Sequence, residues 1–308
     1  MLFSALKDSP RLLIEAKLEP IQGHRFQPTG FPDLGAATYQ APNGTAMLLV
    51  ESAQSVANRL EATIWDESTN DLIPAAQGIP YVKSIIEGSK ETNSILEAHR
   101  LNSPYIATDK KVKGFEEIKN AIGFKENSPF DRNKLVKALA QYDFNSLLHG
   151  VFLEKIAGVV RLPRALSGFV EASNVGVASY GGVKFDRVQP AAKGGDGNVI
   201  YHRADYTGEV TAYFNLDLAQ IRGYGLGEAG EELLVGLALY KIQRFLHDGL
   251  RLRTACDFDA RAVRVTRPGD FALPALAQLE EALPGLVRAA KSLFAATPVT
   301  VVHYSKSK

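Results

Sequence analysis

Two periods of apolar side chains organise the first part of the chain. In residues 11–19 apolar and charged positions alternate, with Ile14, Ala16 and Leu18 on the apolar side. A period of two is typical of a strand that buries one face. These residues are therefore predicted to form a strand, and Pro20 ends it.

From residue 47 onward the apolar side chains recur at every third or fourth position. The residues of this stripe are Leu49, Ala53, Val56, Leu60 and Ile64. Such spacing brings side chains to one side of an α-helix and predicts a helix over residues 47–64. Residues 24–35 form a glycine- and proline-rich loop before it, which is either functional or a solvated crossover.

The same reasoning predicts the later elements. Helices are expected to begin at Ser94, which stands three residues before Glu97 as in a capping box, and after Asp131. A third helix is expected from Glu228. The expected strands are residues 151–160, 165–175, 209–221, 250–255 and 262–266. Glycine-rich residues 176–208 predict a long hairpin, although a surface hairpin without a partner has the same composition.

The order of these elements is strand, helix, strand, repeated once with insertions. This is the order of the split βαβ, or ferredoxin-like, plan, which RNA-recognition domains also use. The predicted fold class is therefore α+β. Residues 66–130 break the regular pattern with several prolines and short polar runs, which is typical of an insertion.

The composition is that of an ordinary globular protein. The chain has 308 residues, 45% of them hydrophobic, enough for a sizeable core in one elaborated domain or two. Its one cysteine, Cys256, excludes an internal disulfide framework and fits a reducing compartment, so a cytoplasmic location is expected. No apolar run reaches the roughly 18 residues of a membrane span, and no export signal is evident.

The net charge of +1 gives no overall attraction for nucleic acid, so a nucleic-acid function needs local charge. Residues 241–267 carry seven basic and three acidic side chains, a local excess of four positive charges. A solvated helix end and strand edge would have a similar composition. This stretch therefore permits RNA binding without indicating it.

Two glycine-containing motifs favour different functions. Residues 225–230 have the form G-x-G-x-x-G of dinucleotide-binding folds, after a strand and at the start of a helix. However, Glu228, Glu231 and Glu232 lie where a pyrophosphate would sit, so a role in chain flexibility is favoured. Residues 222–226 agree with the opening of the RNP1 motif of RNA-recognition domains, and the next three residues depart from it.

Candidate catalytic residues are few. No two histidines have the i, i+4 spacing of a helical metal site. Asp257 and Asp259 have the chemistry to hold a metal, but solvated carboxylates at a turn are the favoured interpretation. His149 and His202 have the chemistry of general bases, yet without a recognisable partner each is interpreted as structural or RNA-contacting. We expect no catalytic residue, no metal and no cofactor.

Five segments form a combination of motifs that is more specific than any one of them. They are RFQPTGFPDLG at 25–35, VESAQSVANRLE at 50–61, SILEAHR at 94–100, NSLLHG at 145–150 and NLDLAQIRGYG at 215–225. Together they resemble the backbone RAMP subunit of the type I-G (formerly I-U) CRISPR Cascade complex. The resemblance covers most of residues 11–267.

This resemblance implies an RRM-like palm, an inserted finger region and a thumb β-hairpin, with several copies polymerising along one guide RNA. The implied divisions are residues 1–65 and 209–267 for the two halves of the palm, 151–175 for further palm strands, 66–150 for the helical finger, 176–208 for the thumb and 268–308 for a C-terminal segment. The implied partners are the crRNA guide, target DNA through guide pairing, copies of the chain and other Cascade subunits. No enzymatic role and no membrane are implied.

The residues expected to bind RNA lie in these motifs, in the hairpin and in adjoining loops. They are Arg25, Gln27, Ser52, Ser55, Arg59, His99, Arg100, His149, Arg161, Arg164, Lys184, Arg187, Lys193, Arg203 and Arg222. A repeated subunit must hold RNA of any sequence, so it should bind phosphates and sugars and leave the base edges free. We expect Arg25, Arg59 and Arg100 to face the guide because each lies outside the apolar stripes.

Two other functional classes remain open. A guide-processing ribonuclease of the same superfamily would need an active histidine or aspartate and would cleave precursor RNA. A nucleotide-binding enzyme would use the glycine motif at residues 225–230 and would bind a cofactor tightly.

Overall fold

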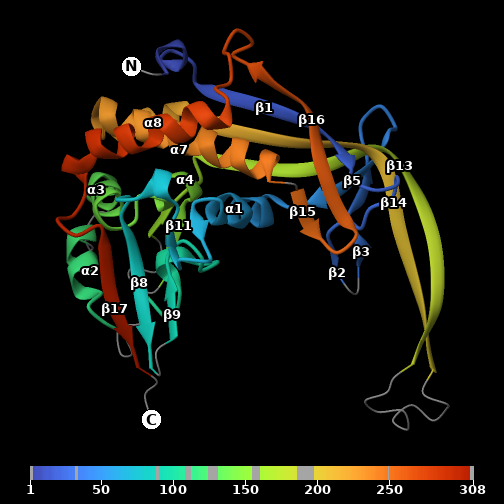
Figure 1. Cartoon of the computed structure of the whole chain (residues 1–308), viewed down its shortest axis with the longest axis horizontal. Coiled ribbons are helices and arrows are strands. Elements are labelled where there is room, and N and C mark those ends of the chain that lie inside the picture. Colours follow the sequence, from blue (N-terminus) through green and yellow to red (C-terminus); the bar gives the residue numbers. More distant parts are fainter. Residues whose placement is uncertain are drawn as a thin grey trace.

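The computed structural model describes residues 3–31, 34–87, 90–107, 112–123, 131–154, 160–185, 198–248 and 250–305. Its largest element is a curled antiparallel sheet with the strand order β15-β16-β1-β14-β13-β5-β4 (Figure 1). These strands are β1 (Arg11–Pro20), β4 (Thr38–Gln40), β5 (Ala46–Glu51), β13 (Leu166–Phe185), β14 (Asn198–Asp217), β15 (Leu250–Arg253) and β16 (Cys256–Arg267).

Strand β1 lies inside this sheet between β16 and β14, and the period-two prediction for it is confirmed. It pairs with β14 from Arg11 opposite Asp217 to Leu18 opposite Val210, and with β16 on its other edge. Leu12, Ile14, Ala16 and Leu18 are buried on one face, whereas Leu13, Glu15 and Lys17 lie on the opposite face. The alternation in the sequence therefore marks the two faces of the sheet.

Two helices cover the buried face, namely α1 (Ala53–Ala62) and α7 (Gly227–His247) (Figure 1). Helix α7 begins within one residue of the predicted Glu228. The short helix α6 (Leu218–Arg222) connects β14 to it, and α8 (Leu276–Ala289) packs along its other side. No helix in the described part of the chain is long and apolar enough to cross a membrane.

The helix predicted for residues 47–64 begins later than expected. Residues Ala46–Glu51 instead form β5, which pairs with β13 and buries Leu48 and Val50. Ser52 then starts α1 by accepting a hydrogen bond from the Ser55 backbone N–H at 3.3 Å. The helical spacing of Leu49 was misleading, because pairing with a distant strand decides the conformation there.

Six elements of the large sheet and its helices follow the order strand, helix, strand twice along the chain. They are β1, α1 and β13, and then β14, α7 and β16. In space the four strands lie in the order β16-β1-β14-β13. The molecule is therefore of the α+β class, as predicted, with its main core between one face of the curled sheet and the two helices.

A second lobe contains a four-stranded sheet with the order β10-β17-β8-β9 (Figure 1). Its strands are β8 (Tyr81–Ile86), β9 (Lys90–Asn93), β10 (Val112–Lys113) and β17 (Val299–Tyr304), and its helices are α2 (Glu116–Ile122) and α3 (Arg132–Tyr142). Strand β17 pairs in parallel with β8, so the C-terminal segment completes the sheet of the inserted region. The region expected to be helical is thus a mixed sheet and helix lobe.

The helix predicted from Ser94 is wrong, because the chain there forms turns and then the 3-10 helix η3 (Arg100–Asn102). The Glu97 carboxylate accepts hydrogen bonds from Thr92 at 2.6 Å and Ser103 at 2.8 Å instead of capping a helix. Arg100 also has a φ of +51°, which an α-helix does not allow. Helix α3, by contrast, begins after Asp131 as predicted.

The predicted strand at 151–160 is a small hairpin of β11 (Val151–Leu153) and β12 (Val160–Leu162). The remaining short elements are η1 (Ser4–Leu6), β2 (Gly30–Phe31), β3 (Gly35–Ala36), β6 (Trp65–Asp66), β7 (Asp71–Leu72), η2 (Pro74–Ala76), α4 (Ser146–His149) and η4 (Lys291–Leu293).

The long hairpin is confirmed for both of its arms. Strands β13 and β14 stay paired from Gly176 opposite Thr207 to Phe185 opposite Asn198, and they extend well beyond the sheet (Figure 1). Residues 186–197, with the candidate residues Arg187 and Lys193, lie outside the described residues.

Candidate nucleic-acid interface

The loop that follows β1 is fastened to the base of the long hairpin. Phe26 and Tyr206 exchange two backbone hydrogen bonds, each of 2.9 Å from N to O. The Phe26 side chain is buried against the ring of Phe258 on β16, with the ring centroids 5.5 Å apart. Because both the backbone and the side chain are fixed, the position of the neighbouring Arg25 is defined relative to the hairpin.

Arg25, Tyr180 and Arg203 form a cluster at this junction, which we call the hairpin-base cluster. The Arg25 guanidinium carbon lies 5.7 Å from the centroid of the Tyr180 ring, and that of Arg203 lies 5.8 Å from it. Both distances are within the range of cation–π interaction. Tyr180 and Arg203 stand opposite each other on β13 and β14, so the hairpin register brings them together.

One carboxylate, that of Asp205, holds this cluster together. Its oxygens lie 3.7 Å from Arg25 Nη1 and 3.5 Å from Arg203 Nε. Gln27 donates a hydrogen bond to the same carboxylate and another, of 2.6 Å, to the backbone oxygen of Ala204. Two cations therefore share one buried carboxylate, which leaves a net positive charge at the junction.

The two guanidinium groups remain accessible, since the side chain of Arg25 is 58% exposed and that of Arg203 is 36% exposed. Tyr180 is exposed as well. Guanidinium groups bind phosphate oxygens in bidentate fashion, and an exposed aromatic ring stacks on any base. The hairpin-base cluster thus has the chemistry to hold a nucleic-acid backbone without reading its sequence.

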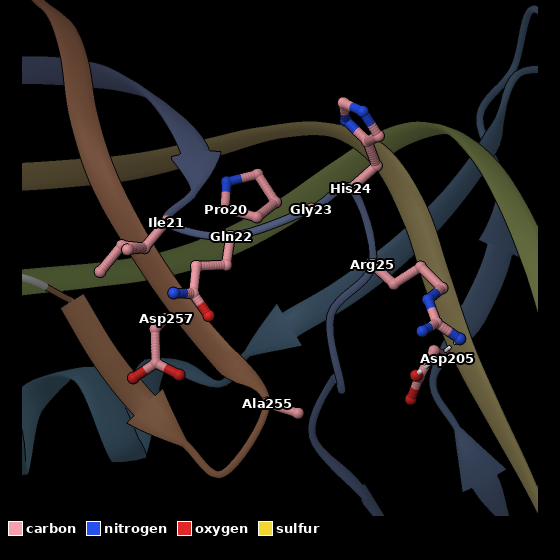
Figure 2. A pocket seen from close by; sticks show the side chains of 9 residues that line it. All are labelled: Pro20, Ile21, Gln22, Gly23, His24, Arg25, Asp205, Ala255 and Asp257. Atoms are coloured by element: carbon pink, nitrogen blue, oxygen red, sulfur yellow. Dashed lines mark ion pairs between the residues drawn. The ribbon is translucent and has the colours of Figure 1, made fainter.

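A hollow of about 510 Å³ lies beside Arg25, as Figure 2 shows. Residues 20–25, Asp205, Ala255 and Asp257 line it. In Figure 2 the Arg25 side chain points towards Asp205, whereas His24 points away from both. Asp257 also pairs with Arg251 at 3.7 Å, and no group of three potential metal ligands occurs among the described residues.

Arg59 is partly buried between α1 and β15. It donates hydrogen bonds to the backbone oxygens of Arg251 and Leu252, and its Nε lies 3.5 Å from the Glu51 carboxylate. It therefore joins α1 to β15, and its contact with the guide stays a prediction. Its neighbours in the motif, Ser52 and Ser55, form the N-terminal cap of α1.

The expectation that Arg100 lies on a surface is wrong. Its guanidinium is buried and pairs with the Glu61 carboxylate of α1 at 2.6 Å. A charged group is stable there because its partner is equally buried and the geometry is bidentate. His99, the preceding residue, is exposed.

His149 is also buried, within a polar network that reaches α7. Lys241 Nζ lies 2.6 Å from Asn145 Oδ1 and 3.2 Å from His149 Nε2. Burial lowers the pKa of Lys241 to about 7 and raises the pKa of Asp143 to about 7. Burial, with the nearby charge of Lys241, holds the pKa of His149 well below its usual value.

The structure thus distributes the candidate residues over separate places. Arg25, Gln27 and Arg203 meet in the hairpin-base cluster, whereas Arg161 and Arg164 meet Arg100 and His149 around another cavity. Arg222 stands apart and donates to the backbone oxygen of Ser9 at 2.9 Å. Lys184 lies on β13, and its side chain is outside the described part of the structure.

Sequence reasoning missed Tyr180, Asp205, Glu61 and Lys241. The only signal for Tyr180 and Asp205 was the hairpin register, which the sequence leaves open because the length of the turn is unknown. Glu61 lies outside the apolar stripe of the predicted helix, and Lys241 lies in the basic stretch of residues 241–267. Both side chains are buried because the side of α1 that carries Glu61 contacts Arg100, and the side of α7 that carries Lys241 contacts Asn145.

A model of the family of CRISPR-associated protein GSU0053 (Cas_GSU0053) matches residues 12–177, just over half of the chain. No curated protein matches the chain. A chain of a "CRISPR RNA-guided surveillance complex, pre-nicking" is similar, with 12% identity, a TM-score of 0.46, and coverage of 92% of this chain and 88% of that chain. A chain of a "CRISPR RNA-guided surveillance complex" has 13% identity, a TM-score of 0.39, and coverage of 88% and 74%.

Proposed function

We propose that this chain, which belongs to the family of CRISPR-associated protein GSU0053, is a non-catalytic backbone subunit of a type I-G Cascade complex that binds guide RNA. The observation that carries the proposal is the hairpin-base cluster. There, two exposed arginines and a tyrosine are held by one carboxylate beside the longest hairpin of the described fold.

The topology supports an RRM-like palm of the RAMP type. The strand order β16-β1-β14-β13, with α1 and α7 as the connecting helices, agrees with the split βαβ plan. The second lobe corresponds to the proposed finger, to which β17 adds a strand from the end of the chain. The arms of β13 and β14 beyond the sheet correspond to the proposed thumb.

The chemistry of the cluster suits a subunit that repeats along a guide. Such a subunit meets a different base at each position, so its contacts must be to phosphate, sugar and the faces of bases. Arginine supplies the contacts to phosphate, and tyrosine supplies the contacts to the faces of bases. The base edges then remain free to pair with target DNA, while further copies of the chain and other Cascade subunits bind alongside in a cytoplasmic complex.

The experiment measures binding of the purified protein to several unrelated guide-length RNAs, followed by sedimentation on the longest of them. We expect similar affinity for every sequence, a steep loss of affinity with salt, and cooperative growth of the complex with protein concentration. Strong preference for one short sequence, or a single bound copy at saturation, would contradict the proposal. Cleavage of precursor RNA by the purified protein would instead identify a processing ribonuclease.

A further inference from the structure

A second basic cavity lies away from the hairpin-base cluster, where the end of α4 meets η3 and the β11–β12 hairpin. Its volume is about 600 Å³. Four basic side chains line it, those of Arg100, His149, Arg161 and Arg164, and the described residues that line it include no carboxylate. We call it the α4 cavity.

Close backbone packing assembles the α4 cavity. Gly150 has a φ of +73°, and a Cβ atom there would lie 2.6 Å from the backbone oxygen of Leu162. The Ala165 backbone N–H donates to the Leu148 oxygen at 2.9 Å, and Phe152 stands opposite Arg161 in the β11–β12 pairing. The segment that carries Arg161 and Arg164 therefore packs directly against the segment that carries His149.

His149 lines the α4 cavity and is held by a neighbour. Its Nε2 and Lys241 Nζ lie 3.2 Å apart and share a hydrogen bond. Its other ring nitrogen, Nδ1, is buried and has no hydrogen-bond partner among the described residues. A buried polar atom without a partner costs free energy, so the ring is an unsatisfied polar group beside the cavity.

The charges around the cavity are also unbalanced. Glu61 neutralises Arg100, whereas Arg161 and Arg164 have no ion pair with any carboxylate in the described structure. Arg164 is half-buried and makes a 3.3 Å hydrogen bond from Nη1 to the backbone oxygen of Ala53, which fixes its orientation. A cavity whose charged side chains are all arginines favours an oxyanion.

We infer that the α4 cavity binds a phosphate group, held by Arg161 and Arg164. Phosphate fits this lining because its oxygens accept from several directions, whereas a carboxylate accepts mainly in one plane. The volume exceeds that of one phosphate and admits part of a nucleotide. On the basis of the proposed function, the group is a backbone phosphate of the guide RNA, at a second point of contact on the same subunit.

The test uses the full chain, the variants Arg161→Gln and Arg164→Lys, and the control Arg261→Gln. Arg261 is an exposed arginine that is paired with Glu19 on the edge of the sheet, far from the cavity in sequence. One arm titrates inorganic phosphate and follows thermal stability together with the imidazole N–H signal of His149 by NMR. The other arm measures RNA affinity against salt concentration.

We expect phosphate to raise the melting temperature of the wild type and to shift the His149 signal. Arg161→Gln should abolish both effects and reduce the slope of the salt dependence of RNA binding by about 0.7, the value for one phosphate contact with a single strand. Arg164→Lys should weaken both effects while leaving the fold intact, and Arg261→Gln should behave as the wild type.

The possible failures are distinguishable. Wild-type RNA binding that Arg161→Gln and Arg164→Lys leave unchanged would overturn the inference and leave the proposed function standing. Absence of RNA binding by the wild type would overturn the proposed function and the assignment to the guide. If phosphate also had no effect on the wild type, the phosphate site itself would be overturned.

Discussion

The Arg100 guanidinium donates two hydrogen bonds to the Glu61 carboxylate, from Nε to Oε1 at 2.7 Å and from Nη2 to Oε2 at 2.6 Å. Glu61 belongs to α1, which packs on the large sheet, and Arg100 belongs to η3 in the second lobe. Asn145 adds a third hydrogen bond to Glu61, of 3.0 Å. The two lobes are therefore joined by a buried ion pair with a satisfied carboxylate.

Replacing Arg100 with Met should destabilise the protein by about 3–5 kcal/mol, because it leaves the Glu61 carboxylate buried without its counter-ion. The double variant Glu61→Leu with Arg100→Met should recover part of this loss, since it removes both charges. Denaturant unfolding of the wild type and the two variants measures the difference. Equal stability of wild type and Arg100→Met would assign Arg100 a role other than structural.

Asp143 should make the stability depend on pH. Burial raises its pKa from 3.8 to about 7, and its Oδ1 has no partner among the described residues. The folded state therefore binds a proton more tightly than the unfolded state, so stability is lost as the pH rises from 4 to 7. Asp143→Asn lacks this loss, and its stability relative to the wild type should increase by as much as about 4 kcal/mol over that range.

Parallel denaturant titrations of the two proteins at acidic and mildly alkaline pH test this expectation. The Asp143 charge also raises the pKa of Lys241, so the difference between the two proteins includes this coupling. A stability difference that stays constant with pH would mean that Asp143 remains ionised in the fold.

Gly150→Ala should be far more costly than Gly44→Ala. Both glycines have positive φ, +73° and +82°, but a Cβ at Gly44 meets no atom within 4 Å, whereas one at Gly150 would contact the Leu162 oxygen at 2.6 Å. Positive φ alone costs about 1–3 kcal/mol. Thermal unfolding of both variants compares the two positions, and similar melting temperatures would show that the α4 cavity does not depend on this close packing.

The double variant Arg25→Ala with Arg203→Ala should bind RNA several-fold more weakly, because it removes two cations that we propose bind the RNA backbone. The slope of log affinity against log salt should fall by about 0.7 for each phosphate that the variant no longer binds. Arg261→Ala is the matched control, since its side chain is 55% exposed and that of Arg25 is 58% exposed. If Arg261→Ala weakened RNA binding as much as each arginine lost in the double variant, the result would indicate general electrostatic attraction without a defined site.

Shortening the long hairpin tests its role in assembly. We expect replacement of residues 189–198 by a two-residue turn to leave the large sheet folded. The β13 residues from Leu166 to Gly176 still pair with β14, from Leu216 to Thr207, and β1 still pairs with β14. The variant should bind short RNA weakly and fail to assemble cooperatively on a full-length guide, as measured by sedimentation. If cooperative assembly were unchanged, the proposed thumb would have to be sought in the insertion between residues 65 and 131.

Local periodicity was sufficient to predict β1, α3, α7 and the two arms of the hairpin. In these segments the apolar pattern, the caps and the glycines all favour the same conformation, so little depends on distant partners. At Leu49 and at Ser94 the local signal was overridden. At Leu49 the chain forms β5, which pairs with β13. After Ser94 the Glu97 carboxylate accepts hydrogen bonds from Thr92 and Ser103.

By itself the sequence determined the α+β class, the order strand, helix, strand that occurs twice around the large sheet, and the presence of arginine at the loop and the hairpin. Only the tertiary structure decided which arginines remain accessible and which are buried. Arg25 stays exposed after the end of a strand, whereas Arg100 is enclosed because η3 meets α1, where the buried Glu61 carboxylate pairs with it. Burial depends on which distant segments meet, and no local pattern of residues records that.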